Sequence, residues 1–191
     1  KMNRDFKMKS LLIIPLFIMS LVSFPSWGLT MDDLVQREGL WYKKFTDVPF
    51  TGEIDEGLEK GAFKNGKREG SWLSYYDNGQ LNTKDYFKDG KIEGTSLTYH
   101  TNGQIWIKSV WKNGFGDYTS YYPNGDLYEK GNYKDGKKEG LWMSYFANGQ
   151  LEYKGSFKDG KREGVWVKYN EDGSKFPLSN GIFKNGVKVS D

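Results

Sequence analysis

The sequence contains no cysteine and only one histidine, His100. Without cysteine there is no disulfide bond, no thiol nucleophile and no cysteine-ligated metal site. The nucleophile elbow G-x-S-x-G, the phosphate loop G-x-x-x-x-G-K-[ST], the zinc motif H-E-x-x-H and the EF-hand spacing are also missing. We therefore predict that the protein is not an enzyme and that it holds no metal and no cofactor.

A net charge of one sign is also missing once the first 28 residues are set aside. Those residues combine four basic side chains with an apolar run, LLIIPLFIMSLVSF at 11–24, and end in S-W-G. This order is typical of a secretory signal peptide, so we predict cleavage after Gly28 and a secreted or periplasmic protein. The alternative is a retained membrane anchor, although the run is shorter than a spanning helix and contains Pro15.

The rest of the chain has 24 basic and 24 acidic side chains. Proteins that bind nucleic acid usually carry a basic excess, so this balance argues against nucleic acid as a partner. The chain is rich in aromatic residues, with 7 Trp, 13 Tyr and 12 Phe, whereas disordered chains are poor in them. The composition therefore predicts a folded protein.

The chain is dominated by a repeated segment of eight residues, which we call the octet. FKDGKREG at 157–164 returns as FKNGKREG at 63–70, FKDGKIEG at 87–94 and YKDGKKEG at 133–140, with a worn copy, WKNGFGDY, at 111–118. A second landmark, Asn-Gly or Asp-Gly, has its glycine at 79, 103, 125, 149 and 173, which gives a period of 24 residues with one interval of 22. Such a period indicates a repeat array.

Each repeat contains two turn signals separated by alternating, aromatic-rich runs such as SWLSYY at 71–76. Asn-Gly and Asp-Gly favour two-residue type I′ hairpin turns, and the alternating runs favour strands. We predict an all-β fold, a single-layer antiparallel meander of 24-residue β-hairpins. Residues 1–28 would be the signal peptide, 29–60 an N-terminal cap with a degenerate first repeat, and 61–191 the array. A capping strand at 182–189, with Lys184 and Lys188, would close it.

Two-residue turns would pair Tyr76 with Leu81 and Trp72 with Asp85. One face of the sheet then carries the tryptophans, which either neighbouring repeats or a binding partner would have to cover. This aromatic face is our first candidate binding site: Trp72, Tyr76, Trp142, Phe146 and Trp166. His100 replaces an aromatic residue in the same column, so we predict a structural role for it and no catalytic one.

The opposite face provides the second candidate site, a column formed by Tyr75, Tyr99, Tyr121, Tyr145 and Tyr169. Apolar positions and four lysines, Lys84, Lys108, Lys130 and Lys154, share this face. The third candidate is a basic turn edge made of Lys67, Arg68, Lys137, Lys138, Lys161 and Arg162, which would meet an anionic lipid or an acidic partner. Interleaved acidic residues leave solvated turns as the alternative for this edge.

Residues 155–173, GSFKDGKREGVWVKYNEDG, resemble a MORN repeat, which also has an aromatic residue, a K-[ND]-G-K turn, a glycine and an aromatic strand. The unit with NGQL and EGLWMSYF is more similar to the bacterial MORN-repeat-variant family, often labelled YwqK-type or antitoxin-like. The resemblance covers about residues 39–188. It departs from the eukaryotic pattern, which has His where this chain has Glu69, Glu93, Glu139 and Glu163. It implies a single-layer sheet used for protein or membrane association, and no fixed activity.

Three functions are consistent with these observations. The first, which we favour, is an exported, non-catalytic scaffold for protein–protein interaction. The second is a module that binds lipid or glycan in the cell envelope. The third is an antitoxin or immunity protein that neutralises a toxin. The oligomeric state and the identity of the partner do not follow from the sequence.

Overall fold

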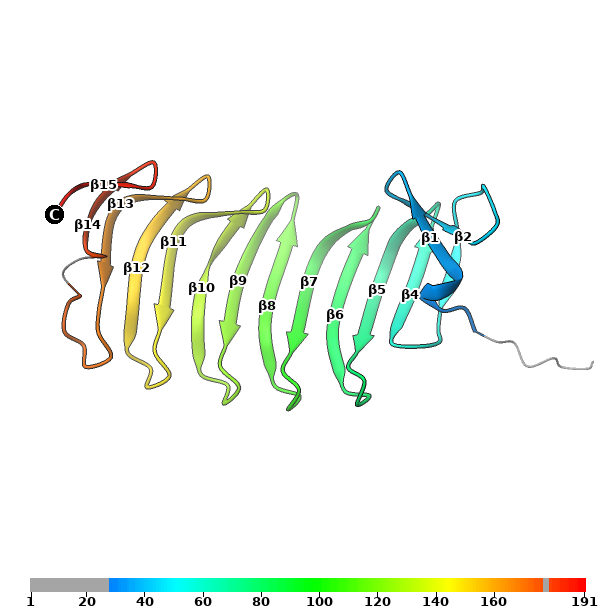
Figure 1. The fold of residues 1–191 in the computed structure, drawn as a ribbon, viewed down its shortest axis with the longest axis horizontal. Helices are drawn as coiled ribbons and strands as arrows, with labels where there is room; N and C mark the ends of the chain where they lie inside the picture. Colours follow the sequence, from blue (N-terminus) through cyan, green and yellow to red (C-terminus); the bar gives the residue numbers. More distant parts are fainter. Residues whose placement is uncertain (1–27, 177–178) are drawn as a thin grey trace, which may run out of the picture.

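The computed structural model describes residues 28–176 and 179–191, and their regular structure is antiparallel β-strand apart from one 3-10 turn. Strands β3 to β15 follow one another in chain order in a single sheet (Figure 1). The prediction of an all-β, single-layer meander is therefore confirmed. The strands are β3 (Gly52–Ile54), β4 (Glu59–Lys64), β5 (Lys67–Tyr75), β6 (Leu81–Lys88), β7 (Lys91–Tyr99), β8 (Ile105–Lys112), β9 (Phe115–Tyr121), β10 (Leu127–Lys134), β11 (Lys137–Tyr145), β12 (Leu151–Lys158), β13 (Lys161–Lys168), β14 (Gly181–Lys184) and β15 (Val187–Ser190).

The octets form the upper turns in Figure 1, and these are the two-residue turns that the sequence predicts. At Asn65 and Gly66 both φ angles are positive, 50° and 76°, as a type I′ turn requires. The same pair of angles recurs at Asp89–Gly90, Asn113–Gly114, Asp135–Gly136, Asp159–Gly160 and Asn185–Gly186. Each turn brings the residues that flank it into register, as Lys64 and Lys67 show.

The lower turns differ, and the prediction of two-residue turns is wrong for them. In the first of them only Gly79 has a positive φ, 81°, and the N–H of Tyr76 donates to the carbonyl of Gln80. The loop therefore has three residues, 77–79. The side-chain oxygen of Asn78 accepts the N–H of Gln80 at 3.0 Å, and this local bond favours the three-residue loop.

The extra loop residue changes the register near the lower turn only. Leu81 pairs with Tyr75, so the predicted pair of Tyr76 with Leu81 is wrong. The ladder then shifts by one residue, and farther from the turn Trp72 pairs with Asp85 as predicted. The assignment of the tryptophans to one face survives because the shift restores the expected alternation.

The strand that follows each octet bends sharply. Gly70, the last residue of its octet, has φ 72°, and the ladder between β4 and β5 shifts register beside it. In Figure 1, β5, β7, β11 and β13 leave the upper turns sideways and then turn downwards. The corresponding glycines with positive φ are Gly94, Gly140 and Gly164. The bend curls the single layer around one of its faces, which allows side chains there to be buried without a second layer.

Along its length the sheet twists little, since the axes of its antiparallel strands keep nearly the same tilt from one end to the other in Figure 1. Flat sheets of many strands are unusual and depend on ladders of side chains. Here the ladder is aromatic: Trp72 lies edge to face with Phe63 at 4.9 Å and with Phe87 at 6.2 Å between ring centroids. The same arrangement recurs around Trp142 and Trp166. Edge-to-face contacts between rings on neighbouring strands therefore link each of these tryptophans to both strands beside it.

Four octets also bind the octet that follows through a glutamate side chain. The carboxylate of Glu69 accepts a hydrogen bond of 2.9 Å from the backbone N–H of Asp89, and the N–H of Gly90 donates to the carbonyl of Arg68 at 3.0 Å. The carboxylate contact recurs from Glu139 to Asp159 and from Glu163 to Asn185 at 2.9 Å, and from Glu93 to Asn113 at 3.3 Å. The octet is thus a turn and an inter-repeat clamp in one segment.

We expect replacement of Glu139 by alanine to speed hydrogen exchange at the amide of Asp159. The amide loses its carboxylate acceptor, and the array should lose about 1 kcal/mol of stability. The amide of Asp135 is the internal control, because it donates to the carbonyl of Gly114 instead and has no glutamate partner. Equal exchange at Asp159 in both proteins, measured by NMR, would contradict the clamp.

The two ends of the array depart from the repeat. The 3-10 turn η1 (Met31–Asp33) and a separate hairpin, β1 (Leu34–Arg37) and β2 (Leu40–Lys43), precede the main sheet. They contribute to a core cluster with Ile54, Phe63 and Trp72. At the other end, the capping strand predicted for 182–189 is wrong: β14 and β15 are two short strands, because the last Asn-Gly forms another type I′ turn.

Candidate functional site

The face around which the sheet curls, here called the tryptophan face, is filled by its own side chains. Three of its indoles, those of Trp72, Trp142 and Trp166, are buried, with 3, 0 and 4% of their surface exposed. Each lies against a glycine where an added Cβ would overlap the ring, and each Nε1 donates to a backbone carbonyl at 3.0 Å. The sets are Trp72 with Gly61 and the carbonyl of Ala62, Trp142 with Gly131 and Asn132, and Trp166 with Gly155 and Ser156. Neighbouring strands, one of the two alternatives left open by the sequence, cover the rings.

Three residues of the predicted basic turn edge belong to this packing. The guanidinium of Arg68 lies 4.2 Å from the ring centroid of Trp72, Lys138 Nζ lies 3.7 Å from that of Trp142, and the guanidinium of Arg162 lies 4.6 Å from that of Trp166. Arg68 and Lys138 also form ion pairs with Glu59 and Glu129 at 2.8 and 2.7 Å. These cations cover the ladder from the side of the bent strands.

The other three residues of that edge, Lys67, Lys137 and Lys161, are exposed beside the upper turns. The stems of Lys67 and Lys137 lie close to the glycines of the next turns, Gly90 and Gly160. The six predicted cations therefore do not form one surface, because successive residues of a strand point to opposite faces of the sheet.

The tryptophan ladder is interrupted in the second and third repeats. In the third, Tyr118 and Ser109 occupy the positions of the tryptophan and of its underlying glycine. In the second, Ser96 and Asp85 occupy them. The hydroxyl of Ser96 donates to the carboxylate of Asp85 at 2.6 Å. The glycine and the tryptophan are thus replaced together by two side chains that form a hydrogen bond with each other.

The lower part of this face holds a column that includes two predicted site residues, Tyr76 and Phe146, and also His100 and Tyr122. The hydroxyls of Tyr76 and Tyr122 donate to the carbonyls of Tyr99 and Tyr145 in the next repeat, at 2.6 and 2.9 Å. His100 Nε2 lies 3.0 Å from the carbonyl of Tyr121 in the same way. Its position supports the predicted structural role, since the imidazole takes the place of a tyrosine hydroxyl; Phe146 has no donor for this bond.

A half-buried pair of polar side chains joins two repeats on the same face. The hydroxyl of Tyr153 donates to the carboxylate of Glu129, which also pairs with Lys138. Burial is the main reason that the pKa of Tyr153 lies far above its ordinary value of 10.0, and the hydrogen bond and charge of Glu129 add to it. Burial raises the pKa of Tyr122, Tyr128 and Tyr133 in the same direction.

We expect the folded protein to lose stability as the pH rises above about 10, because tyrosines ionise first in the unfolded chain. The folded state keeps the proton of Tyr153, so the unfolded state binds fewer protons and is favoured by further alkali. Urea unfolding at about pH 9 and about pH 11 would show this loss, and Tyr153→Phe should reduce it. An equal loss in the wild type and the variant would exclude Tyr153 as a source.

The opposite side of the sheet, which we call the tyrosine–lysine face, is arranged in rows that cross the array. Cross-strand pairing places lysines and apolar residues alternately in one row, and the predicted tyrosine column runs beside it. The lysines are Lys60, Lys84, Lys108, Lys130 and Lys154; the residues between them are Leu73, Leu97, Thr119, Met143 and Val167; the tyrosines are Tyr75, Tyr99, Tyr121, Tyr145 and Tyr169.

The side chains of this face are available to solvent. All five tyrosines are half-buried, and four of the five lysines are exposed, with Lys130 intermediate. Lys60 Nζ lies 5.9 Å from the ring centroid of Tyr75. Within the described residues none of the five lysines forms an ion pair, whereas the acidic residues Glu59, Glu129 and Glu152 pair with cations on the tryptophan face.

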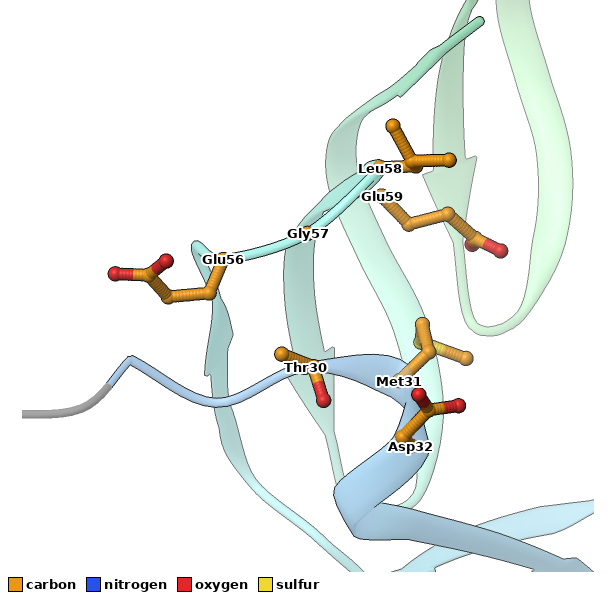
Figure 2. Close-up of a pocket in the computed structure, with 7 residues that line it drawn as sticks. All are labelled: Thr30, Met31, Asp32, Glu56, Gly57, Leu58 and Glu59. Carbon is orange, nitrogen blue, oxygen red and sulfur yellow. The ribbon is translucent and has the colours of Figure 1, made fainter. Parts of the chain in front are cut away.

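A hollow of about 350 Å³ lies at the N-terminal end, between the segment around η1 and the loop that joins β3 to β4 (Figure 2). Its acidic side chains, Asp32, Glu56 and Glu59, lie apart in Figure 2 and do not converge on one point. Across the described residues no group of three His, Cys, Asp or Glu side chains is placed to hold a metal ion. The hollow therefore offers no paired groups for acid–base chemistry.

The part of the chain that the structure describes contains no helix of the length and hydrophobicity needed to cross a membrane. The predicted signal peptide lies outside this part, since residues 1–27 are not described. Its cleavage after Gly28 stays a prediction.

Sequence reasoning missed Lys60 as the first member of the lysine row, because the repeat is worn at that end. The 24-residue interval from Lys60 to Lys84 was the available signal. It also missed the contact of Arg68 with Trp72, which depends on the bend at Gly70 and has no counterpart in the residue pattern.

Comparison with known proteins agrees with this division of the chain into hairpins. Residues 68–89, 92–113, 116–135 and 138–159 each match the family model described as MORN repeat variant. Every match starts just after one upper turn and ends at the next, so each covers two strands from β5–β6 to β11–β12. None of the curated proteins compared with the chain matches it.

Proposed function

Because the chain contains four repeats of the MORN repeat variant, we propose that it is a scaffold that binds another protein, and that the tyrosine–lysine face is its docking surface. Repeats of this kind are in general modules that bind proteins or membranes, and their family is non-catalytic. The scaffold role and the choice of face are inferences from the chain itself.

The contrast between the two faces carries the proposal. On the tryptophan face, the predicted site residues Trp72, Trp142 and Trp166 are buried and hydrogen-bonded within the array, so they have little surface left for a partner. The other face exposes aromatic, apolar and cationic side chains in ordered rows. Tyrosine in particular offers a rigid apolar ring with a polar tip, a combination that is enriched at protein interfaces.

We further infer that the protein acts in a bacterial cell envelope or outside the cell. The support is the order of basic, apolar and small residues in 1–28, which is typical of an export signal. Mass spectrometry of the N-terminus of the protein from its source cell would test this inference. An intact segment 1–28 would contradict cleavage after Gly28.

Site-specific photo-cross-linking tests the docking surface. We expect p-benzoylphenylalanine in place of Tyr121 to capture a discrete protein in the source cell. The same probe in place of Trp106, which is 44% exposed and stacks on His100 on the tryptophan face, is the matched control. Capture from both positions, or from Trp106 alone, would overturn the assignment of the face, and capture from neither would overturn the scaffold role.

A further inference from the structure

Lysines without ion-pair partners in the described part of the chain cross the middle of the tyrosine–lysine face in a row, whereas lysines and carboxylates are mixed at the upper turns, as Lys88 and Asp89 show. The five lysines of the row lie across the middle of the strands, and none of them has an anionic partner among the described residues. Exposed carboxylates lie instead at both ends of the strands. The upper turns carry Asp89, Asp135 and Asp159, and the lower turns carry Asp77, Asp126, Glu171 and Asp172.

Carboxylates border the row on the side of the upper turns. Asp117, two residues before Thr119 on β9, pairs with Asn132 and accepts a hydrogen bond of 2.6 Å from its side-chain amide. The glutamates of the octets, Glu69, Glu139 and Glu163, pair with residues two positions beyond a lysine of the row, and their carboxylates accept backbone N–H groups of the next upper turns. These carboxylates lie above the row and leave the line of five lysines continuous.

The spacing of the lysines follows from the order of the strands. Consecutive lysines lie two strands apart, on β4, β6, β8, β10 and β12. Since neighbouring strands are about 4.8 Å apart, the step between lysines is about 9.6 Å. A partner that meets every lysine must repeat its negative charge at that interval.

A polyproline II segment fits this step better than the other regular conformations. Its three residues per turn advance about 9.3 Å, so a carboxylate at every third position drifts by only about 1.2 Å over four steps. An α-helix presents the same side every seven residues, about 10.5 Å, and drifts by about 3.6 Å over the same length. A β-strand presents one side every two residues, about 6.7 Å, and falls out of step at once.

We propose that the tyrosine–lysine face binds an acidic protein segment in the polyproline II conformation, with a carboxylate at every third residue paired to the lysine row. The inference rests on the proposed function and specifies its partner. The tyrosine column beside the row suits the same ligand, because polyproline II segments dock on surfaces lined by aromatic rings. Tyr75 and Lys60 lie together at one end of both rows.

A lipid bilayer fits the face less well. A flat membrane would approach the whole face. Lysines and carboxylates are mixed at the upper turns and add little net attraction, and the carboxylates of the lower turns would repel the membrane. A narrow segment that follows the row meets the lysines and avoids both edges. The arrangement of these lysines in a row therefore favours a linear acidic ligand.

The test measures binding of two labelled peptides to the full chain by fluorescence anisotropy. The first contains five Glu-Pro-Ala triplets, and the second has the same composition with its glutamates contiguous. We expect the first peptide to bind the protein on the order of tenfold more tightly than the second. High salt should weaken the binding of both peptides. Equal affinities would overturn the proposal, because they would indicate attraction to a polyanion without register.

Charge reversals on the same strands locate the site. Lys84→Glu with Lys154→Glu changes the row on β6 and β12, and Lys88→Glu with Lys158→Glu changes exposed lysines four residues away, next to the upper turns. We expect the first pair of substitutions to lower the affinity for the triplet peptide by at least about tenfold, and the second pair to lower it by less than about threefold. Equal losses in the two pairs would overturn the assignment to the row.

Two further outcomes separate this inference from the proposed function. Binding to phosphatidylglycerol vesicles that is lost in Lys84→Glu with Lys154→Glu, without binding of either peptide, would overturn the proposal in favour of a membrane. If neither peptide binds while the probe at Tyr121 still captures a protein, the inference of an acidic ligand is wrong and the scaffold role stands.

Discussion

Replacement of Trp142 by alanine is expected to lower the free energy of unfolding by about 3–5 kcal/mol. Trp142 is completely buried, and its ring lies edge to face with Tyr133 and Phe157 at 5.1 and 6.1 Å. Lys138 covers it, and its Nε1 donates to the carbonyl of Asn132. The change would remove the ring that joins three consecutive strands and leave a cavity in a sheet that has no second layer to fill it. Urea unfolding followed by fluorescence and circular dichroism measures the loss.

Trp106→Ala is the matched control, because this indole is 44% exposed and stacks only on His100. We expect it to cost less than about 1 kcal/mol. In a repeat array the damage at Trp142 should also spread to the neighbouring hairpins, since each repeat depends on its neighbours. Similar losses in the two variants would contradict the assignment of Trp142 as the centre of the ladder.

Replacement of Gly131 by aspartate is expected to cost more than about 3 kcal/mol, and a second change at Trp142 should restore part of it. The new Cβ would overlap the indole of Trp142, and the carboxylate would lie without a partner against an aromatic ring. With Trp142→Ser, the double variant reproduces the natural pair Asp85 and Ser96, whose side chains bond at 2.6 Å. We expect a favourable coupling of about 1–3 kcal/mol between the two sites.

The comparison of single and double variants gives this coupling directly from urea unfolding. The control pair combines Trp142→Ser with Gly61→Asp, since Gly61, on β4, lies against Trp72 and far from Trp142 on β11. Its two losses should add within about 0.5 kcal/mol. If Gly131→Asp is as unstable with serine at 142 as with tryptophan, the paired replacement seen at Asp85 and Ser96 is not a compensation.

The repeat period and the two faces of the sheet were predictable because they depend on local chemistry. The regular glycines mark the turns, and alternation along the strands sorts residues such as Trp72 and Tyr75 to opposite faces. The lower turns were predicted wrongly because Asn-Gly is compatible with both turn types. The choice depends on the bond from Asn78 to the N–H of Gln80, which the dipeptide alone does not specify.

The candidate sites were harder to predict because burial in this fold depends on the bend of the strands. Positive φ at Gly70 turns Arg68 onto Trp72 and closes the tryptophan face, whereas the sequence places Arg68 only near a turn. Four lysines of the row could be predicted from the sequence. Only the structure shows that they form no ion pairs among the described residues and that nearby glutamates pair with cations on the other face. The role of Glu69 as a clamp required the position of the next repeat.

The forward hydrogen bond from each octet gives the chain a simple way to change its length during evolution. Most repeats receive a carboxylate from the octet before them and offer one to the octet after them, and at Asp135 the carbonyl of Gly114 accepts the amide in place of a carboxylate. At the N-terminal end the hydroxyl of Thr51 takes the place of the missing glutamate and accepts the N–H of Asn65 at 2.8 Å. After duplication or loss of one 24-residue unit, the amide of each upper turn would therefore still have an acceptor in the octet before it. Each such event would lengthen or shorten the molecule by two strands, or about 9.6 Å.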